Sequence, residues 1–340
     1  MRIAVIGAGG WGTALAMLLS TAGHNVCLWV RRPDLCEALI HSRENVPYLP
    51  QISLPAPLMF SSSLTEAVIQ AEMVVLAIPS HALRTISQQL YPSLSTNALI
   101  VSTTKGIEED TLLTMTAVLK EELAPLSHSH LAVLSGPSFA ADVARGLPTA
   151  VTVAAEEESL AATVQRIFSS PRFRVYTTND VIGVEIGGAV KNVIAIAAGV
   201  SDGLEYGYSA RAALITRGLA EITRLAVVLG ANPQTLSGLA GMGDLILTCT
   251  SNVSRNHTVG VRIAEGEKIT DILAGMKMVA EGVRTCRSVF ALAQRHRVEM
   301  PIVEQVYALL YRQEPPQRVV TELLARENKP EFPRFLPGEN

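Results

Sequence analysis

Cysteine is scarce in this sequence, and its spacing excludes several classes of protein. The chain has four cysteines in 340 residues, Cys27, Cys36, Cys249 and Cys286, and none of them forms a C-x-x-C pair. A structural zinc site needs such paired ligands, and a secreted disulfide scaffold needs a denser set of cysteines. We therefore expect a reduced, cytoplasmic protein. No cluster of His, Cys and Asp offers metal-ligand spacing either, so we expect no bound metal.

Excess positive charge and long apolar runs are also missing. The chain carries 28 Lys and Arg against 31 Asp and Glu, and this net charge of −3 gives no basic field for nucleic acid. Because no run of about 20 uncharged apolar residues occurs, we expect no membrane span. The apolar N-terminus lacks the charged region of a secretion signal. With 48% hydrophobic and 17% charged residues, the chain should be globular, and its length suggests roughly two domains.

The first dozen residues have the pattern of a strand, a glycine turn and a helix. An apolar run from Arg2 to Ile6 precedes GAGGWG at 7–12, and a run with helical spacing follows. In a dinucleotide-binding fold, Gly7 allows the tight turn, Gly9 lets the backbone approach a pyrophosphate, and Gly12 lets the helix pack on the strand. The helix start then offers N–H groups and a positive dipole end. The alternative is a glycine-rich turn without a ligand, but the strand that follows favours nucleotide binding.

A second strand, from Asn25 to Val30, ends at Arg31 and Arg32. This position of the fold reads the adenosine ribose. An acidic residue there accepts a hydrogen bond from the 2′-hydroxyl, whereas an arginine attracts a 2′-phosphate. The pair therefore predicts that NADP is accepted and preferred over NAD. The alternative is that both arginines are merely solvated at the strand end.

The rest of the first half alternates strands with helical runs. Strands are predicted at 73–78, 98–102, 131–134, 149–154 and 172–176. This alternation predicts a doubly wound, Rossmann-type parallel sheet up to residue 178, with added strands at the far edge. Four prolines between Glu44 and Pro57 predict an irregular, stiffened loop. Tyr48 in this loop either packs on the cofactor or covers the core.

Two of these strands end in candidate site residues, because ligands bind at the carboxyl ends of parallel strands. Lys105 follows the strand at 98–102, and its place at this edge favours an active-site charge over a solvated lysine. The strand at 131–134 leads into SGPSFA. Ser138 in this turn is expected to cap the helix that begins near Ala140, and a bound ligand would also be within its reach.

After Asn179 the strand signals stop and the pattern becomes helical. We expect a dinucleotide-binding domain at 1–178, an all-helical substrate and catalytic domain at 179–325, and a frayed tail at 326–340. The key helix opens at Asp180 and carries Lys191 in an apolar run.

Two glycines, Gly187 and Gly188, lie one turn before Lys191 in this helix. Helical side chains lean toward the N-terminus, so the Lys191 stem should lie over these glycines. Each glycine costs about 1 kcal/mol against alanine in a helix interior. The pattern therefore predicts a needed space, a notch below the ammonium group. The alternative is close helix packing with Lys191 reaching out to water.

Two further segments have the composition of a ligand site. Asp244 follows the glycines of GMGD at 241–244 and is expected to be open to approach. Ser254, Arg255 and Asn256 precede a helical run at 258–264. A serine cap, an arginine fork and an amide at a helix start predict a phosphate site, and a plain capping segment is the alternative.

Several blocks together resemble the bacterial NAD(P)-dependent glycerol-3-phosphate dehydrogenases. They are GAGGWGTALA at 7–16, STTKG at 102–106, SGPSFA at 135–140, GGAVKNVIAIAAGVSDG at 187–203, GLAGMGDLILTCTS at 238–251 and SRN at 254–256. The resemblance spans nearly the whole chain. It implies interconversion of dihydroxyacetone phosphate and sn-glycerol 3-phosphate with NADP or NAD, which supplies phospholipid synthesis.

The resemblance also implies roles for individual residues. Lys191 would donate and accept the proton, with Lys105 and Asp244 as catalytic neighbours that respectively lower and raise its pKa. The substrate would be surrounded by Lys105, Gly136, Ser138, Lys191, Asp244, Ser254, Arg255 and Asn256. Besides Gly7, Gly9, Gly12 and Arg32 from the motifs above, the dinucleotide would contact Gly10, Trp11, Arg31, Tyr48, Lys105, Ala140, Arg255, Val279 and Glu281.

Two other functions stay open from the sequence. A related two-domain dehydrogenase for a hydroxy acid or a hydroxyacyl thioester would share both halves but lack the phosphate site at 254–256. A redox-sensing module would bind NAD(P)H without turning over a substrate, and the apolar surroundings of Lys191 argue against it. We also expect a homodimer, although the apolar helices of the second half could equally pack within one chain.

Overall fold

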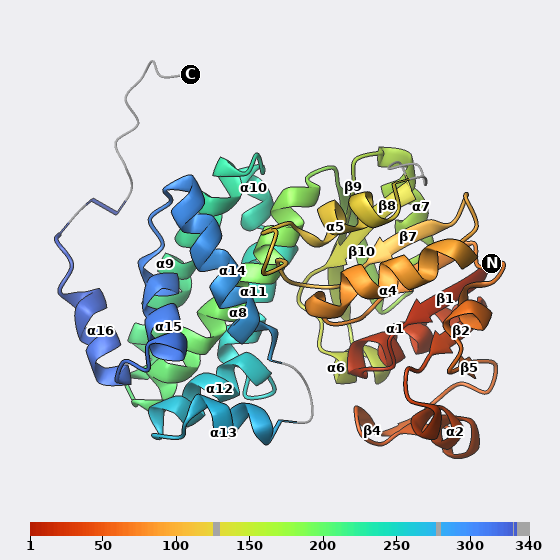
Figure 1. The fold of residues 1–340 in the computed structure, drawn as a ribbon, viewed down its shortest axis with the longest axis horizontal. Helices are drawn as coiled ribbons and strands as arrows, with labels where there is room; N and C mark the ends of the chain where they lie inside the picture. The colour runs from red at the N-terminus through yellow and green to blue at the C-terminus, as the bar shows by residue number, and fades with distance from the viewer. Residues whose placement is uncertain (125–129, 277–279, 329, 332–340) are drawn as a thin grey trace.

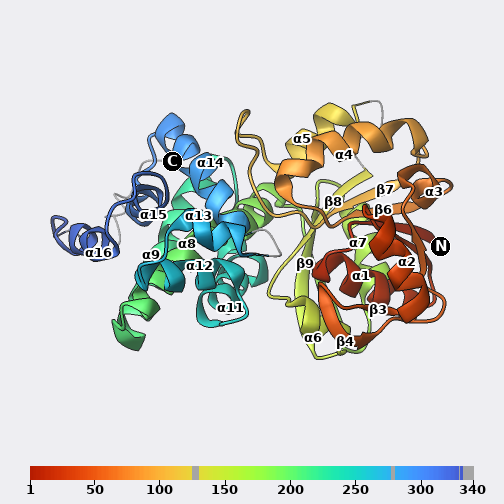
Figure 2. The ribbon, with the colours of Figure 1, turned by 60° about the horizontal axis from the view of Figure 1, so that its bottom comes forward.

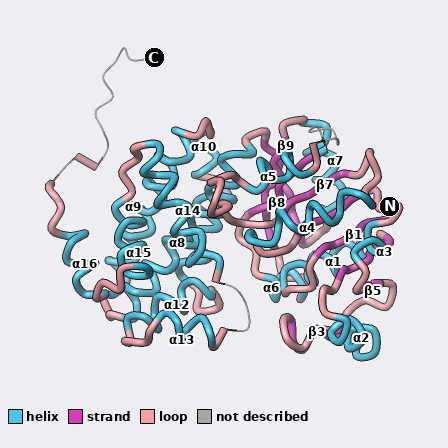
Figure 3. The backbone as a smooth tube through the Cα atoms, in the orientation of Figure 1, coloured by secondary structure: helices cyan, strands magenta, loops and turns pink. Residues whose placement is uncertain are grey.

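The computed structural model describes residues 1–124, 130–276, 280–328, 330 and 331. Two halves lie side by side, one built around a sheet and the other built from helices (Figure 1). Figure 3 shows the same division, with the strands gathered in the half that contains the N-terminus. The predicted fold class is confirmed: a doubly wound, Rossmann-type sheet is followed by a helical C-terminal domain.

The sheet has eight strands in the spatial order β10-β9-β8-β7-β6-β1-β2-β5. They are β1 (Arg2–Ile6), β2 (Asn25–Trp29), β5 (Met59–Ser61), β6 (Met73–Leu76), β7 (Leu99–Ser102), β8 (Leu131–Ser135), β9 (Thr149–Ala155) and β10 (Phe173–Thr178). All neighbours pair in parallel except β8 and β9. The chain order reverses between β1 and β6, and the carboxyl ends at such a switch point are where ligands bind in this kind of sheet.

Helices cover both faces of the sheet, as Figure 2 shows. One face carries α1 (Gly10–Thr21), α6 (Ala140–Ala144) and α7 (Glu158–Phe168) and is packed through residues such as Leu15 and Phe168. The other carries α3 (Leu64–Val68), α4 (Leu83–Leu90) and α5 (Met115–Glu122) and is packed through residues such as Leu83 and Val118. Strands covered on both sides must be apolar throughout, which explains the MVVL sequence of β6. This half also holds α2 (Pro33–Ser42) and the short 3₁₀ turns η1 (Ser80–Ala82) and η2 (Tyr91–Ser93).

The structure corrects the prediction of an irregular loop between Glu44 and Pro57. This proline-rich stretch instead holds a small antiparallel pair, β3 (Glu44–Asn45) and β4 (Leu49–Ser53). Proline does exclude helix there, but it is tolerated in an isolated two-stranded ribbon, where one side of each strand has no partner. The pair also places Asn45 under the glycine turn, where its side-chain amide donates to the carbonyl of Ala8 at 3.0 Å and to the hydroxyl of Thr13 at 2.8 Å.

The helical half is organised around α8 (Val181–Gly203), whose residues are buried from Gly183 to Ser201. The predicted start is confirmed, because the Asp180 side chain accepts a hydrogen bond from the Gly183 amide at 2.9 Å and caps the helix. Around it lie α9 (Gly207–Val228), α10 (Pro233–Leu236), a π-helix η4 (Leu239–Gly243), α11 (Asp244–Thr250), α12 (Arg255–Ala264), α13 (Ile269–Ala274), α14 (Glu281–His296), α15 (Pro301–Tyr311) and α16 (Pro316–Leu324). Within the described residues, α8 is the one helix long and apolar enough to cross a membrane, and here it is the buried core of this half.

Two glycines set how closely α8 and α12 cross. A Cβ on Gly199 would lie 2.0 Å from the carbonyl oxygen of His257, and one on Gly260 would lie 2.1 Å from that of Ile196. Neither position can carry a side chain, so the two backbones touch. This contact fixes the segment at 254–256, which opens α12, against the helix that carries Lys191.

Candidate active site

Three predicted catalytic residues meet where the two halves of the molecule join. Lys105 follows β7, Lys191 lies in the middle of α8, and Asp244 is the first residue of α11. The Lys191 Nζ donates to Asp244 Oδ1 at 2.5 Å, and the Lys105 Nζ donates to Asp244 Oδ2 at 2.5 Å. One carboxylate therefore holds two ammonium groups, one on each oxygen.

Burial differs sharply among the three side chains. Asp244 is 1% exposed and Lys191 is 9% exposed, whereas Lys105 is 23% exposed. The glycines before Asp244 predicted that it is open to approach. This prediction is wrong, because the Asp244 side chain is buried. A Cβ on Gly241 would collide with the backbone of Leu236, so that glycine serves close packing of the π-helix. Since π-helical turns are rare and recur at functional sites, this one marks the segment that aims the carboxylate.

The pKa of Lys191 is lowered from its ordinary value of 10.5 to about 8. Burial is the largest cause, because an ammonium group loses its hydration in the protein interior. The Asp244 carboxylate opposes this shift, and the Lys105 ammonium adds to it. The effects of Asp244 and Lys105 on the Lys191 pKa have the predicted directions, whereas the effect of burial was not predicted. An amine with such a pKa can exist in both protonation states near neutral pH.

Thr248 belongs to the same cluster and was missed from the sequence. Its hydroxyl accepts from the Lys191 Nζ at 2.7 Å and donates to the backbone carbonyl of Asp244 at 2.6 Å. The spacing of four residues from Asp244 along α11 was the available signal, because residues at this spacing share one face of a helix.

The two glycines before Lys191 do not form an open notch. A Cβ on Gly187 would lie 2.8 Å from the carbonyl oxygen of Ala240, and one on Gly188 would lie 2.9 Å from the Ser135 hydroxyl. The space is filled by η4, by the end of β8 and, beside Gly188, by the Lys105 stem, whose Cγ and Cδ lie 3.6 Å from such a Cβ. The close-packing alternative is therefore correct for the glycines. Lys191 nevertheless does not extend out into solvent: its side chain is 9% exposed, and its amine is bonded inside the protein to Asp244 and Thr248.

The segment at 254–256 lies beside the lysine helix. The Ser254 hydroxyl accepts from the His257 amide at 3.3 Å and caps α12, which begins at Arg255, three residues earlier than predicted. The Asn256 amide donates to Asn192 Oδ1 at 2.9 Å and accepts from the Gly282 amide at 2.9 Å. Asn192 directly follows Lys191 and was not among the predicted site residues. Arg255 is exposed at the helix start.

The turn at 135–140 corrects one prediction. Ser138 does not cap α6, because the residue at the capping position is Phe139, which makes no side-chain hydrogen bond there. The Ser138 hydroxyl instead donates to the carbonyl of Gly136 at 3.1 Å. Gly136 has φ +143, and a Cβ there would lie 2.9 Å from Val151, so the antiparallel neighbour β9 requires a glycine at this turn.

The glycine turn after β1 fits a dinucleotide. Gly7 has φ +113, and a Cβ on Gly12 would lie 1.9 Å from the Gly7 carbonyl oxygen, whereas nothing lies within 4 Å of a Cβ on Gly9. Open space thus faces the start of α1, where no side chain caps the N–H groups. Next to this turn, the backbone of Tyr48 and the Cβ of Ala140 lie 2.9 and 3.5 Å from a Cβ placed on Gly10. Tyr48 and Trp11 also pack against the core of this half, so Tyr48 does cover the core.

The remaining predicted cofactor residues lie around the same edge. Arg31 and Arg32 are exposed after β2, and the Arg32 side chain lies 3.9 Å from Asp34. Glu281 starts α14 and reaches across to Ser80 after β6, accepting from its hydroxyl at 2.7 Å and from its amide at 3.3 Å. Val279 lies outside the described residues.

Comparison with known proteins identifies the family of this chain. Residues 2–161 match the family model described as the NAD-dependent glycerol-3-phosphate dehydrogenase N-terminus, and residues 180–321 match the model of its C-terminus. The chain belongs to the NAD-dependent glycerol-3-phosphate dehydrogenase family. A glycerol-3-phosphate dehydrogenase [NAD(P)+] from Syntrophotalea carbinolica is 53% identical over 98% of this chain and all of its own length. The enzyme of the same name from Koribacter versatilis is 51% identical over 97% of this chain and 98% of its own length. Among solved structures, glycerol-3-phosphate dehydrogenase from Coxiella burnetii superposes with a TM-score of 0.91 at 40% identity, covering 96% and 99% of the two chains.

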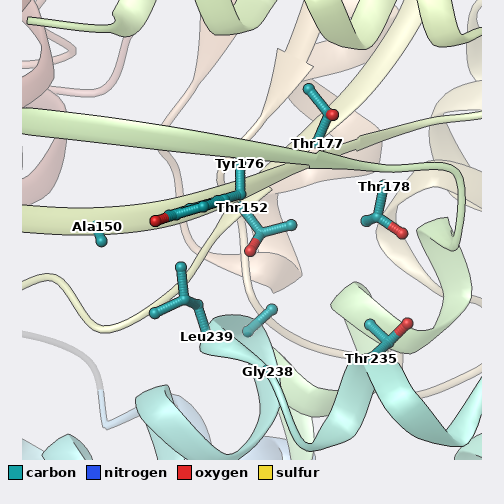
Figure 4. A pocket seen from close by; sticks show the side chains of 9 residues that line it. Ala150, Thr152, Tyr176, Thr177, Thr178, Thr235, Gly238 and Leu239 are labelled. Atoms are coloured by element: carbon teal, nitrogen blue, oxygen red, sulfur yellow. The ribbon is translucent and has the colours of Figure 1, made fainter.

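A separate cavity of about 420 Å³ lies between the sheet and the helical half and differs in chemistry from the cluster of Lys105, Lys191 and Asp244. Figure 4 shows Thr152 and Tyr176 of the sheet facing Leu239 and Thr235 of the helical half across it. None of its lining residues is a lysine, an arginine or a predicted site residue, so it lacks the cationic side chains of the candidate active site. Among the described residues, no three His, Cys, Asp or Glu side chains gather as metal ligands.

Proposed function

We propose that this protein reversibly transfers a hydride between NAD(P)H and dihydroxyacetone phosphate, giving sn-glycerol 3-phosphate for phospholipid synthesis. One observation carries the proposal: a buried lysine with a pKa of about 8 shares a carboxylate with a second lysine at the ligand-binding edge of a dinucleotide fold. Full-length likeness to enzymes named for this reaction supports the substrate. The three segments are proposed as a dinucleotide-binding domain at 1–178, a substrate domain at 179–325 and a tail at 326–340.

A spectrophotometric assay tests the activity. Purified protein should consume NADPH or NADH, followed at 340 nm, only when dihydroxyacetone phosphate is added. Because two arginines follow β2, we expect a higher kcat/KM with NADPH. A higher kcat/KM with NADH would mean that the arginines are only solvated. Cofactor binding without any substrate-dependent oxidation, or turnover of a hydroxy acid instead, would support the rival functions.

In the proposed mechanism the chain polarises the ketone and supplies a proton. A dinucleotide held at the glycine turn would supply a hydride to C2 of the substrate. Negative charge then grows on the C2 oxygen, where Lys191 as ammonium stabilises it and donates the proton, and in the reverse direction Lys191 accepts one. Asp244 and Thr248 hold the Lys191 amine in place through their hydrogen bonds. Lys105 adds positive charge beside the same oxygen.

The turn at Gly9 and the start of α1 would hold the dinucleotide, and Arg31 and Glu281 would also face it. Tyr48, Ala140 and Trp11 would border this site. Gly136, Ser138 and the residues at 254–256 are proposed to surround the substrate. In this arrangement Arg255 and the N-terminus of α12 bind the substrate phosphate. Because the phosphate lies away from the reacting carbon, binding it positions the carbonyl against the cofactor.

Replacing Arg255 by alanine should raise KM for dihydroxyacetone phosphate by about 10- to 100-fold, because a hydrogen bond to a charged group is lost. Steady-state kinetics at fixed, saturating cofactor measure this change. Arg262→Ala is the matched control, since Arg262 lies on the same helix and pairs with Glu267 at the surface. If Arg255→Ala changed only the KM for the cofactor, the phosphate role would be wrong.

We propose a cytoplasmic homodimer. The four cysteines are all free thiols, which suits a reducing compartment. Large apolar side chains are exposed at both ends of α9, including Tyr208, which is 83% exposed, and Val228, and a second copy could cover them. Light scattering should give twice the chain mass of 36.4 kDa, and a mass equal to one chain would exclude the dimer.

A further inference from the structure

Each reduction removes a proton from Lys191, and the structure restricts how that proton returns. The Lys191 side chain is 9% exposed, and both of its hydrogen-bond partners, Asp244 and Thr248, are more than nine-tenths buried. A buried amine that has given up its proton must regain one from solvent before the next turnover. A neighbouring group with greater solvent contact can carry it.

The two buried partners are poor carriers. Thr248 donates its single hydroxyl hydrogen to the backbone carbonyl of Asp244 at 2.6 Å, and a backbone carbonyl does not pass a proton on. Asp244 is 1% exposed, so it has no solvent contact at which to exchange. Each can orient the Lys191 amine, but neither connects it to water.

Lys105 has the contacts that the other two lack. Its side chain is 23% exposed, and its amine is held on the second oxygen of the carboxylate that binds Lys191. The shared carboxylate places the two amines side by side. Lys105 accordingly lowers the pKa of Lys191 both through its charge and through direct side-chain interaction. Lys105 is therefore the member of this pair with the greater solvent contact.

We propose that Lys105 is the proton carrier that recharges Lys191 after each reduction, a role that rests on the function proposed above. After Lys191 gives its proton to the C2 oxygen, its Nζ is a neutral amine with a free lone pair. The Lys105 ammonium transfers one proton to that lone pair and takes one from water at its exposed side. No atom changes its oxidation state in this step, and glycerol 3-phosphate oxidation runs it in reverse.

The decisive variant is Lys105→Arg, which keeps a cation beside Asp244 but cannot release a proton at neutral pH. Stopped-flow mixing of the enzyme–NADPH complex with saturating dihydroxyacetone phosphate follows the first and later turnovers at 340 nm. We expect the first turnover, which uses the proton already on Lys191, to slow far less than the later ones. A burst of about one equivalent per site should precede a steady state slower by about ten-fold or more.

A chemical readout separates proton delivery from electrostatics. The slow phase of Lys105→Arg should speed up as a small amine or imidazole buffer is added, because the buffer can deliver the missing proton. The wild type and the control Lys120→Arg, whose lysine pairs with Glu156 at the surface, should show no such buffer dependence. If Lys105→Arg did not fold, Lys105→Met with rescue by the same amines would replace it.

Three results would overturn the proposal. Equal loss of the first and later turnovers, with no rescue by buffer, would make Lys105 only a charge or a substrate contact. An unchanged steady state would mean that Lys191 regains its proton by another route, and a folded Lys105→Met that amines do not rescue would count equally against the carrier. Failure of the proposed function is a different outcome, because the wild type would then oxidise no NADPH or NADH with dihydroxyacetone phosphate.

Discussion

Replacing Lys191 by alanine is expected to lower kcat by about 10²-fold or more, the usual contribution of a positioned acid or base. The loss should be large because the amine is held within 2.7 Å of both Asp244 and Thr248 and is directed by them. Cofactor binding should remain near that of the wild type, since Lys191 lies on α8, away from the glycine turn. Steady-state kinetics and a fluorescence titration with NADPH measure the two properties.

Lys191→Arg is the informative companion to this variant. Arginine retains the positive charge but cannot donate its proton at neutral pH, so kcat should stay low while the substrate KM changes little. Lys268→Ala, on the surface before α13, serves as the control. Normal turnover by Lys191→Ala would show that Lys191 is not the proton donor.

The pH profile tests the same residue without mutation. Reduction needs Lys191 in its protonated form, and its pKa is about 8. The rate of dihydroxyacetone phosphate reduction should therefore be full below this value and fall as the pH rises through it. Oxidation of glycerol 3-phosphate needs the neutral amine and should rise over the same range. A reduction rate that stayed constant to pH 10 would contradict the assignment.

The parts of the fold that were predictable have local causes. The turn at 7–12 needs glycines in its own few residues, and Asp180 caps α8 through the amide only three positions away. Alternating strand and helix signals then lead to a doubly wound sheet, since parallel strands need crossovers. The ribbon of β3 and β4 was missed because its proline content is typical of loops, and its pairing is visible only in three dimensions.

The candidate site could be proposed from the sequence residue by residue, but its arrangement could not. Lys105 and Asp244 are 139 residues apart, and no local pattern states that they share a salt bridge. The resemblance to a family brought them together, whereas burial of Asp244 and the packing of Gly187 depend on where η4 lies. Glycine in a helix signals that space is needed, but the sequence does not say whether a ligand or the protein fills it.

A second large effect is expected on stability, at a site far from the chemistry. Glu221 on α9 is buried, and its carboxylate accepts from the amides of Ile302 at 2.8 Å and Val303 at 3.3 Å, capping α15. Burial raises its pKa from 4.5 to about 7, although the two amides and Arg224 oppose the shift and Glu304 adds to it.

The sign of the effect follows from this raised pKa. Between about pH 4.5 and 7 the folded protein keeps the Glu221 proton that the unfolded chain has lost, so this contribution to stability is full below that range and disappears as the pH rises through 7. The shift corresponds to about 3 kcal/mol. Glu221→Gln keeps the shape of the side chain and cannot ionise. The free energy of unfolding is measured in urea at pH 5 and at pH 8.5 for both proteins. Its decrease from pH 5 to pH 8.5 should be larger for the wild type than for Glu221→Gln, by about this amount. Because the comparison between the two proteins cancels every other titrating group, an equal drop in both would show that Glu221 is ionised in the folded protein throughout, and that its bonds to α15 outweigh its burial.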